Sequence, residues 1–255
     1  MLEIFAIANQ KGGVGKTTTA VNLAASLAVA EKKTLLIDLD PQANAGSGVG
    51  IDKKDISKSI YNIFFEKISL DEIIVKTPLP SLDLVPSSDS LVGAEIELVG
   101  MENREQILKG ALQGLQETYE FVIIDCPPSM GLLTINALIA AHAVIIPVQC
   151  EYYAMEGLSG LMKTIRLIRN TYNRDLKICG ILLTMYDGRN NLSRQVEKEL
   201  RGFFDKQVFT TVIPRNVRLS EAPSHGLPVL LYDISSKGAK SYLDLAKEIL
   251  DRKEQ

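Results

Sequence analysis

Short apolar runs alternate with helix-length segments along this 255-residue chain. Strand-length apolar runs lie at residues 4–8, 34–38, 121–125, 143–148, 178–184 and 208–213. Segments with helical length and spacing lie at residues 17–30, 158–170, 192–204 and 237–251. Runs that are apolar on both faces are typical of parallel strands covered by helices on each side. The pattern predicts one α/β domain over residues 1–255, with a mostly parallel twisted sheet and helices on both faces. The less regular stretch 49–100 is expected to be an insertion at the sheet edge.

The composition is that of an ordinary globular protein, with 46% hydrophobic and 23% charged residues. The three cysteines form no C-x-x-C pair, which favours a reducing compartment. We see no basic leader at the start of the chain and no apolar run near the roughly 20 residues that span a bilayer. These features predict a cytoplasmic protein that does not enter the membrane.

A phosphate-binding loop is predicted at residues 9–18, which read NQKGGVGKTT between an expected strand and an expected helix. Glycines let backbone N–H groups wrap a phosphate, and the following helix points its positive end at it. Lys16 is expected at the β- and γ-phosphates of ATP, Thr17 on Mg²⁺, and Thr18 at the α-phosphate. The first position of the usual pattern holds Gln10 instead of glycine. The predicted nucleotide-binding residues of this loop are Lys11, Gly12, Gly13, Val14, Gly15, Lys16, Thr17 and Thr18.

Two other strand-like runs end in aspartate, at Asp38 followed by Asp40, and at Asp125. Ligands of α/β sheets lie at the carboxyl ends of the strands, where these carboxylates emerge. Asp125 and Asp38 are therefore candidates to orient Mg²⁺-bound water, and Asp40 is a candidate to orient the attacking water. The alternative is that these aspartates cap helices.

The charge is distributed unevenly, because residues 1–130 are acidic overall and residues 131–255 are basic. This asymmetry indicates either a local anionic partner or a set of solvated helix faces. Charge counts alone leave both interpretations open.

These stretches, together with 147–156 and 214–224, resemble the deviant Walker A ATPases of the ParA/Soj chromosome- and plasmid-partitioning family. The resemblance implies that Lys11 is a signature lysine that reaches the ATP of the partner in a nucleotide-sandwich homodimer. It implies that Asp40 is needed for hydrolysis and that Glu151 contacts the dimer or nucleotide site. The adenine end of the pocket is implied to include Thr184, Pro214 and Asn216.

The same resemblance implies non-specific binding of double-stranded DNA on the nucleoid, through Arg189 and Arg218. A ParB-type centromere-binding partner is implied to stimulate hydrolysis, which releases the DNA. Arginine contacts to phosphates are independent of sequence and sensitive to salt. Other basic residues add to the field or are simply solvated: Arg166, Arg169, Lys198, Arg201 and Arg215.

Three rival functions share this fold. A MinD-like membrane-positioning ATPase requires a basic amphipathic tail, whereas the apolar positions of residues 241–255 favour a helix docked on the core. Nitrogenase iron-protein relatives need two cysteines per subunit for a shared cluster, but Cys126, Cys150 and Cys179 fit buried, inert positions better. A small-molecule kinase or ligase has no supporting substrate motif.

Overall fold

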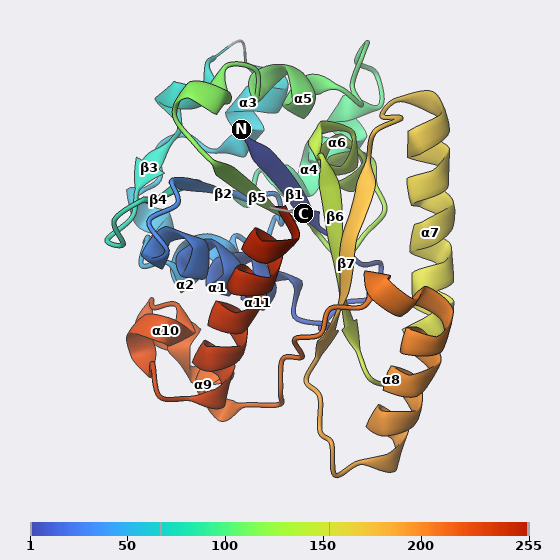
Figure 1. Ribbon diagram of the computed structural model, residues 1–255. Helices are drawn as coiled ribbons and strands as arrows, with labels where there is room; N and C mark the ends of the chain where they lie inside the picture. The colour runs from blue at the N-terminus through green and yellow to red at the C-terminus, as the bar shows by residue number, and fades with distance from the viewer. Residues whose placement is uncertain (1, 67, 153, 254–255) are drawn as a thin grey trace.

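A seven-stranded sheet forms the centre of the molecule, which is described here by a computed structural model covering residues 2–66, 68–152 and 154–253 (Figure 1). The strand order is β3-β4-β2-β5-β1-β6-β7. Only β3 and β4 pair in the antiparallel sense among the described ladders, which confirms the prediction of a mostly parallel sheet. The strands are β1 (Glu3–Ile7), β2 (Thr34–Asp38), β3 (Val75–Lys76), β4 (Leu82–Val85), β5 (Phe121–Asp125), β6 (Ala143–Gln149) and β7 (Lys177–Thr184).

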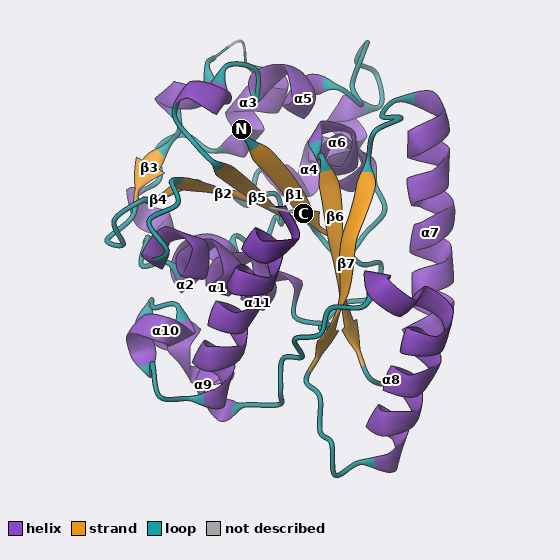
Figure 2. Ribbon diagram, in the orientation of Figure 1, coloured by secondary structure: helices purple, strands orange, loops and turns teal. Residues whose placement is uncertain are grey.

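Helices cover both faces of the sheet, as predicted (Figure 2). The face that carries Phe5 and Ile7 packs on α1 (Lys16–Val29), α2 (Asn44–Gly48), α10 (Val229–Tyr232) and α11 (Lys237–Lys253), with α9 (Val217–Glu221) beside them. The opposite face, which carries Ile4 and Ala6, packs on α3 (Ile60–Phe65), α4 (Leu91–Leu98), α5 (Ile107–Ala111), α6 (Leu132–Ala140), α7 (Ala154–Thr171) and α8 (Asn191–Phe204). Successive strand residues point to opposite faces, so both sides of a central strand are apolar.

The expected strand at 208–213 is not a strand, which corrects the sequence analysis. It touches β7 through a bridge at Val208 and through the Phe209 and Ile213 N–H groups, which donate to the carbonyl oxygens of Ile181 and Leu183 at 2.9 and 2.8 Å. Between those points the Thr210 and Thr211 N–H groups donate to Glu248 of α11, at 2.8 and 2.9 Å. The segment does not form a continuous ladder with β7, because the Glu248 carboxylate binds the backbone N–H groups of Thr210 and Thr211.

The stretch 49–100 does lie at the sheet edge, but it contributes more than an insertion. It supplies β3 and β4, and β4 pairs in parallel with β2. The apolar pattern did not predict β4, because Asp83 places a carboxylate in the middle of its apolar run. In the structure the Tyr119 hydroxyl donates to Asp83 at 2.7 Å and Lys76 Nζ donates to it at 2.7 Å, so the carboxylate is buried with partners.

The C-terminal helix α11 docks on α1, as the spacing of its apolar residues predicts. Tyr242, Leu245 and Ile249 are buried, and the Tyr242 hydroxyl lies 3.2 Å from Thr19 Oγ1. None of the helices in the described ranges combines the length and apolar character needed to cross a bilayer.

Candidate nucleotide site and basic surface

The loop between β1 and α1 is shaped by two glycines in the left-handed region, Gly13 at φ 73° and Gly15 at φ 85°. Residues with a Cβ are strained there, so glycine is required. Gly15 is the N-cap of α1, and Lys16 and Thr17 form its first turn. Free N–H groups and the helix dipole at this end form an anion-binding site. Val14 is buried between them, and its carbonyl accepts a 2.8 Å hydrogen bond from Thr184 Oγ1.

Lys16 is buried under this loop, with only 7% of the residue exposed. Its Nζ donates to the Lys11 carbonyl at 3.2 Å. Burial lowers the pKa of Lys16, and the charges of Asp125 and Asp40 oppose that shift. A buried cation beside a helix N-terminus is matched to the charge of a phosphate.

The carboxylates of Asp38 and Asp125 end neighbouring strands, where the two residues are paired in register. Asp38 accepts hydrogen bonds from the N–H groups of Asp40 and Ala45 at 3.0 and 2.9 Å. Burial raises the pKa of Asp38 to about 7. Burial, and then the charge of Asp38, raise the pKa of Asp125 well above its ordinary value.

Asp125 is fully buried, and neither of its carboxyl oxygens accepts a hydrogen bond of normal geometry in the described chain, although the nearby Thr17 side chain acts to lower its pKa. An unpaired buried carboxylate is costly, so its presence here needs a reason. The residues fit Mg²⁺, which binds through one or two carboxylates together with waters and substrate phosphates. Within the described ranges, no group of three or more His, Cys, Asp or Glu is arranged to hold a metal ion by itself.

Asp40 is half-buried at the rim of the phosphate site. Its Oδ1 accepts from the Gln42 N–H at 3.0 Å, and its carbonyl accepts from Ser87 Oγ at 2.7 Å. A cavity of about 350 Å³ brings the loop and the acidic segment together. Its lining includes Gly12, Gly13, Gly15, Lys16, Thr17, Thr18, Asp40, Gln42, Asn44, Pro128 and Met185.

A second cavity of about 260 Å³ contains all three residues expected at the adenine end. Thr184, Pro214 and Asn216 line it, and Asn216 also caps α9 by accepting from the Arg218 N–H at 3.0 Å. Both cavities share Gly15, Thr18 and Met185, so they adjoin. The sequence analysis missed Met185, Leu219 and Tyr242 in this lining, because nothing in an apolar residue type marks it as facing a ligand.

Lys11 and Glu151 meet within one chain. Lys11 Nζ donates to Glu151 Oε2 at 2.6 Å, and the two side chains are 38% and 46% exposed. Gln10 beside it packs on α7 at Gly160, where an added Cβ would lie 2.6 Å from Gln10 Oε1. Gln10, at the deviant first position of the loop, therefore contacts α7 at Gly160, a contact that the sequence did not predict.

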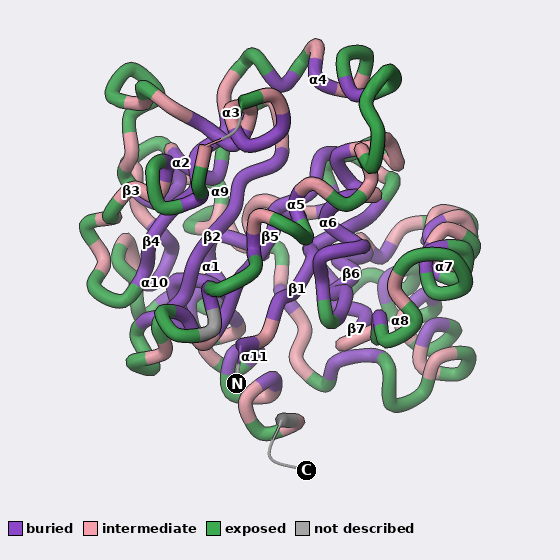
Figure 3. The backbone as a smooth tube through the Cα atoms, turned by 90° about the horizontal axis from the view of Figure 1, so that it is seen from above, coloured by how far each residue is buried: buried purple, intermediate pink, exposed green. Residues whose placement is uncertain are grey.

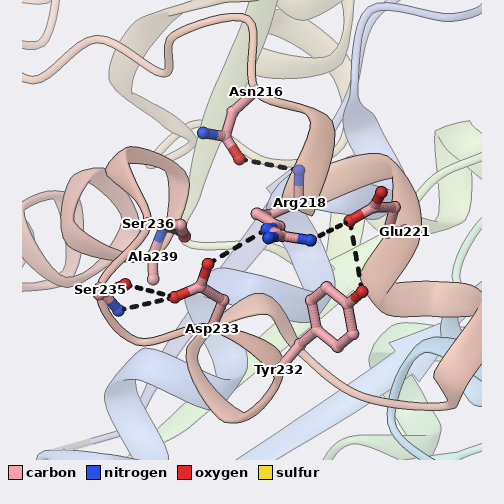
Figure 4. A network of polar contacts seen from close by, with 8 residues as sticks. All are labelled: Asn216, Arg218, Glu221, Tyr232, Asp233, Ser235, Ser236 and Ala239. Atoms are coloured by element: carbon pink, nitrogen blue, oxygen red, sulfur yellow. Dashed lines mark hydrogen bonds and ion pairs between the residues drawn. The ribbon is translucent and has the colours of Figure 1, made fainter.

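The two arginines expected to bind DNA each have an acidic partner. Arg189 forms a two-point contact with Asp187 at 3.0 and 2.9 Å, yet its side chain is 92% exposed. Arg218 bridges Glu221 at 2.8 Å and Asp233 at 3.2 Å (Figure 4). It also lies 5.9 Å from the centre of the Tyr232 ring. Arg218 thus joins α9 to α10 as well as facing solvent.

The remaining basic residues differ in their surroundings. Arg201 pairs with Glu197 at 2.9 Å and is a structural helix charge, Arg215 lines the second cavity, and Lys198 is exposed on α8. Arg166 and Arg169 on α7 make no ion pair with the described residues, and both border a groove of about 990 Å³ between α7 and α8.

The cysteines are placed as expected for inert thiols. Cys126 and Cys150 are buried, and Cys179 is partly buried. Burial raises the pKa of Cys150 to about 11 and that of Cys179 to about 12. A high thiol pKa disfavours the thiolate that reacts or binds metal.

Comparison with known proteins gives consistent matches over the chain. The family model described as an AAA domain matches residues 2–178. The chain is 57% identical to the chromosome partitioning protein ParA of Myxococcus xanthus, over 98% of this chain and 88% of that protein. It is also 57% identical to the sporulation initiation inhibitor protein Soj of Bacillus subtilis, over 98% of both chains.

Solved structures show the same fold. Cobyrinic acid a,c-diamide synthase of Mycobacterium smegmatis, with a bound ATP analogue and magnesium, superposes with a TM-score of 0.87 at 35% identity, over 100% of this chain and 97% of that one. The septum site-determining protein MinD of Pyrococcus horikoshii, complexed with Mg-ADP, gives 0.80 at 25% identity, over 98% and 96%. Sequence identity to ParA and Soj, at 57% over nearly the full chain, is higher than to these two solved structures. This chain belongs to the ParA/Soj family of chromosome-partitioning ATPases.

Proposed function

We propose that this chain is an ATP-dependent DNA-partitioning protein, in which Mg-ATP drives dimerisation and non-specific DNA binding, and hydrolysis releases the DNA. The observation that carries the proposal is the pair of adjoining cavities along the phosphate-binding loop, with the buried Asp125 carboxyl close to Lys16 and Thr17 of the lining. Their linings supply glycine N–H groups and a buried lysine for phosphates, and an apolar end for a base.

The chain's own residues have distinct tasks in the proposed reaction. Gly12, Gly13 and Gly15 give the backbone donors, and Lys16 holds the β- and γ-phosphates. Thr17, Asp38 and Asp125 would hold Mg²⁺, which when bound neutralises charge on the phosphates. Asp40 orients the attacking water from the rim of the site. Thr18 contacts the α-phosphate, and Thr184, Pro214 and Asn216 enclose the adenine.

Dimerisation supplies the last cation. Lys11 leaves Glu151 and reaches the phosphates of the second copy, where it stabilises charge in the transition state as an arginine finger does. The ion pair is half-exposed, and exposed pairs contribute at most about 1 kcal/mol, so a triphosphate can outcompete it. A single chain lacks this cation and hydrolyses ATP slowly.

DNA binding uses Arg189 and Arg218 on the outer surface of the dimer. The high exposure of Arg189 supports this use. Joining two copies doubles the number of phosphate contacts, so affinity for DNA rises with ATP. A ParB-type partner stimulates hydrolysis, and the protein works in the cytoplasm on the nucleoid.

Two rival functions have less support. The docked apolar side of α11 leaves no free amphipathic tail in the described chain for a MinD-like attachment to lipid. The diamide synthase named above shares 35% identity with this chain, against 57% for ParA and Soj.

The proposal is tested by a DNA mobility shift with ATP, ADP or no nucleotide. We expect retention of unrelated duplexes with ATP alone, and loss of retention as salt is raised. Replacing Arg189 and Arg218 together with alanine is expected to abolish the shift while ATP-dependent dimers persist. If the double variant shifts DNA as strongly as the unsubstituted chain, these arginines are not part of the DNA-binding surface.

A further inference from the structure

Helix α4 is apolar on two opposite sides. Leu91, Ala94 and Leu98 face the core and are at most 1% exposed. On the other side Val92, Ile96 and Val99, here called the α4 stripe, are 71%, 79% and 61% exposed. Figure 3 shows α4 at the periphery of the molecule. A contiguous exposed apolar patch often marks an interaction site, and the described chain leaves this one uncovered.

Glu95, between the two faces, ties α4 to the loop that follows β5. Ser129 Oγ donates to Glu95 Oε1 at 3.3 Å. The carboxylate also lies over Gly131, where an added Cβ would be 1.9 Å from Oε1. In the same loop, the Cβ of Pro128 is 4.0 Å from the Cβ position of Gly12 in the phosphate loop. Helix α4, which carries the α4 stripe, is therefore linked to the phosphate site through Glu95 and residues 128–131.

The charges beside the α4 stripe decide what kind of surface can cover it. Asp89, Glu97 and Glu102 are exposed along α4 and its two ends, and Arg104, which pairs with Glu105, donates to the Val99 carbonyl. The net charge of this set is negative, which disfavours DNA phosphates and anionic lipid headgroups. An apolar protein surface remains, and the link to the phosphate loop places that surface where a second copy has to approach.

We propose that the α4 stripe is part of the interface between two copies of this chain in the ATP-bound state. The inference rests on the proposed ATP-driven dimer and names a surface that this dimer buries. Each Lys11 must reach the phosphate loop of the other copy, so the loops at 128–131 and the α4 helices beside them are brought to the contact. Because a two-fold dimer uses the same patch on both copies, each substitution in α4 acts twice. The α4 stripe supplies the apolar surface and Lys11 the charge.

The test places Ile96→Glu in an Asp40→Ala background, which retains ATP. Sedimentation velocity with Mg-ATP is expected to show at least a tenfold weaker dimer, while binding of a fluorescent ATP analogue to the monomer is unchanged. Phe203→Glu is the matched control, because Phe203 on α8 has the same 79% exposure. It is expected to dimerise normally.

Hydrogen exchange on the Asp40→Ala chain without a change in α4 gives a second measurement, independent of folding defects. Peptides covering 91–99 are expected to become protected with ATP and not with ADP. Dimers that leave α4 unprotected, or that persist in Ile96→Glu, overturn this inference alone. Absence of dimers in the Asp40→Ala chain overturns both the inference and the proposed dimerisation.

Discussion

Asp125 combines full burial, a raised pKa and two carboxyl oxygens that accept no hydrogen bond of normal geometry in the described chain. These features are costly in a nucleotide-free protein and useful once a cation is near. At the scale of single residues, the site therefore lowers the stability of the nucleotide-free fold and favours the binding of a cation. Lys16 shows the same trade, because its burial lowers the pKa of a group that must carry charge.

Asp125→Asn tests this trade directly. The amide keeps the shape and removes the ionisable group whose pKa burial raises. We therefore expect the free energy of unfolding of the nucleotide-free protein to rise by about 1–3 kcal/mol, and its unfolding temperature with it. The variant is expected to lose the gain in ATP affinity that Mg²⁺ gives the unsubstituted chain. Thermal unfolding and titration with ATP, each with and without Mg²⁺, provide the two readings. A less stable variant with intact Mg²⁺ dependence would contradict our reading of Asp125.

Asp38 predicts a pH dependence with a definite sign. Its pKa is about 7 in the folded chain against an ordinary value of 3.8. Between those values the folded chain keeps a proton that the unfolded chain releases, so the free energy of unfolding falls as pH rises from 4 to 7. Each pKa unit corresponds to about 1.4 kcal/mol.

The measurement is urea unfolding at pH 4.5 and pH 7.5, for the nucleotide-free chain and for Asp38→Asn. The variant is expected to lose the part of the pH slope that Asp38 contributes. Parallel slopes for the two proteins would show that Asp38 titrates normally.

Asp40→Ala separates binding from turnover. Asp40 lines the phosphate cavity but lies at its rim, half-buried, outside the Asp38–Asp125 pair. We expect the variant to bind Mg-ATP with unchanged affinity and to lose phosphate release by a factor of about 100 or more, in the range that positioned general bases contribute. Normal turnover would remove Asp40 from the mechanism. Lys16→Ala serves as the comparison and is expected to lose nucleotide binding itself.

At the scale of elements, the Arg218 network connects α9 to α10. Arg218 is shared among Glu221, Asp233 and Tyr232 (Figure 4), and α9 carries Leu219 and Ser220 of the second cavity. If Arg218 binds DNA as proposed, a phosphate has to compete with these acids for the guanidinium group, and the acids weaken that binding.

Asp233→Asn is expected to strengthen ATP-dependent DNA binding by a few fold, because one competitor for Arg218 is neutralised. The affinity is measured by fluorescence anisotropy of a labelled duplex across a salt series. Glu72→Gln, which breaks the similarly exposed Lys58–Glu72 pair, is the control and should leave affinity unchanged. Weaker DNA binding by Asp233→Asn would mean that the pair positions Arg218 for DNA rather than competing with it.

The sequence predicts those elements whose pattern is local. The run of β1 leads into the glycine-rich phosphate-binding loop, and the runs of β2 and β5 end at aspartates. The structure places all of these elements as expected. Prediction fails at β4, where the partners of Asp83 come from β3 and Tyr119, and at 208–213, where Glu248 takes the donors. Those contacts join residues far apart in sequence, which a local pattern does not contain. The near acidic partners of Arg189 and Arg218 are a different case, because Asp187 and Glu221 lie only two and three residues away. Asp233, the second acidic partner of Arg218, is not local.

At the scale of the whole molecule, one copy presents an incomplete site. Lys11 is held by its own Glu151, and the α4 stripe is exposed beside the phosphate loop. In the proposed dimer, a second copy that meets the first across the two nucleotides would complete the site with its Lys11 and cover the α4 stripe. Dimerisation on ATP is therefore the central claim, and DNA binding and release depend on it.

The most direct test is sedimentation velocity of the purified chain with Mg²⁺ and a saturating non-hydrolysable ATP analogue, compared with ADP and with Lys11→Ala. We predict a dimer with the analogue, a monomer with ADP, and a much weaker dimer for Lys11→Ala. A chain that remains monomeric when saturated with the analogue would contradict the account.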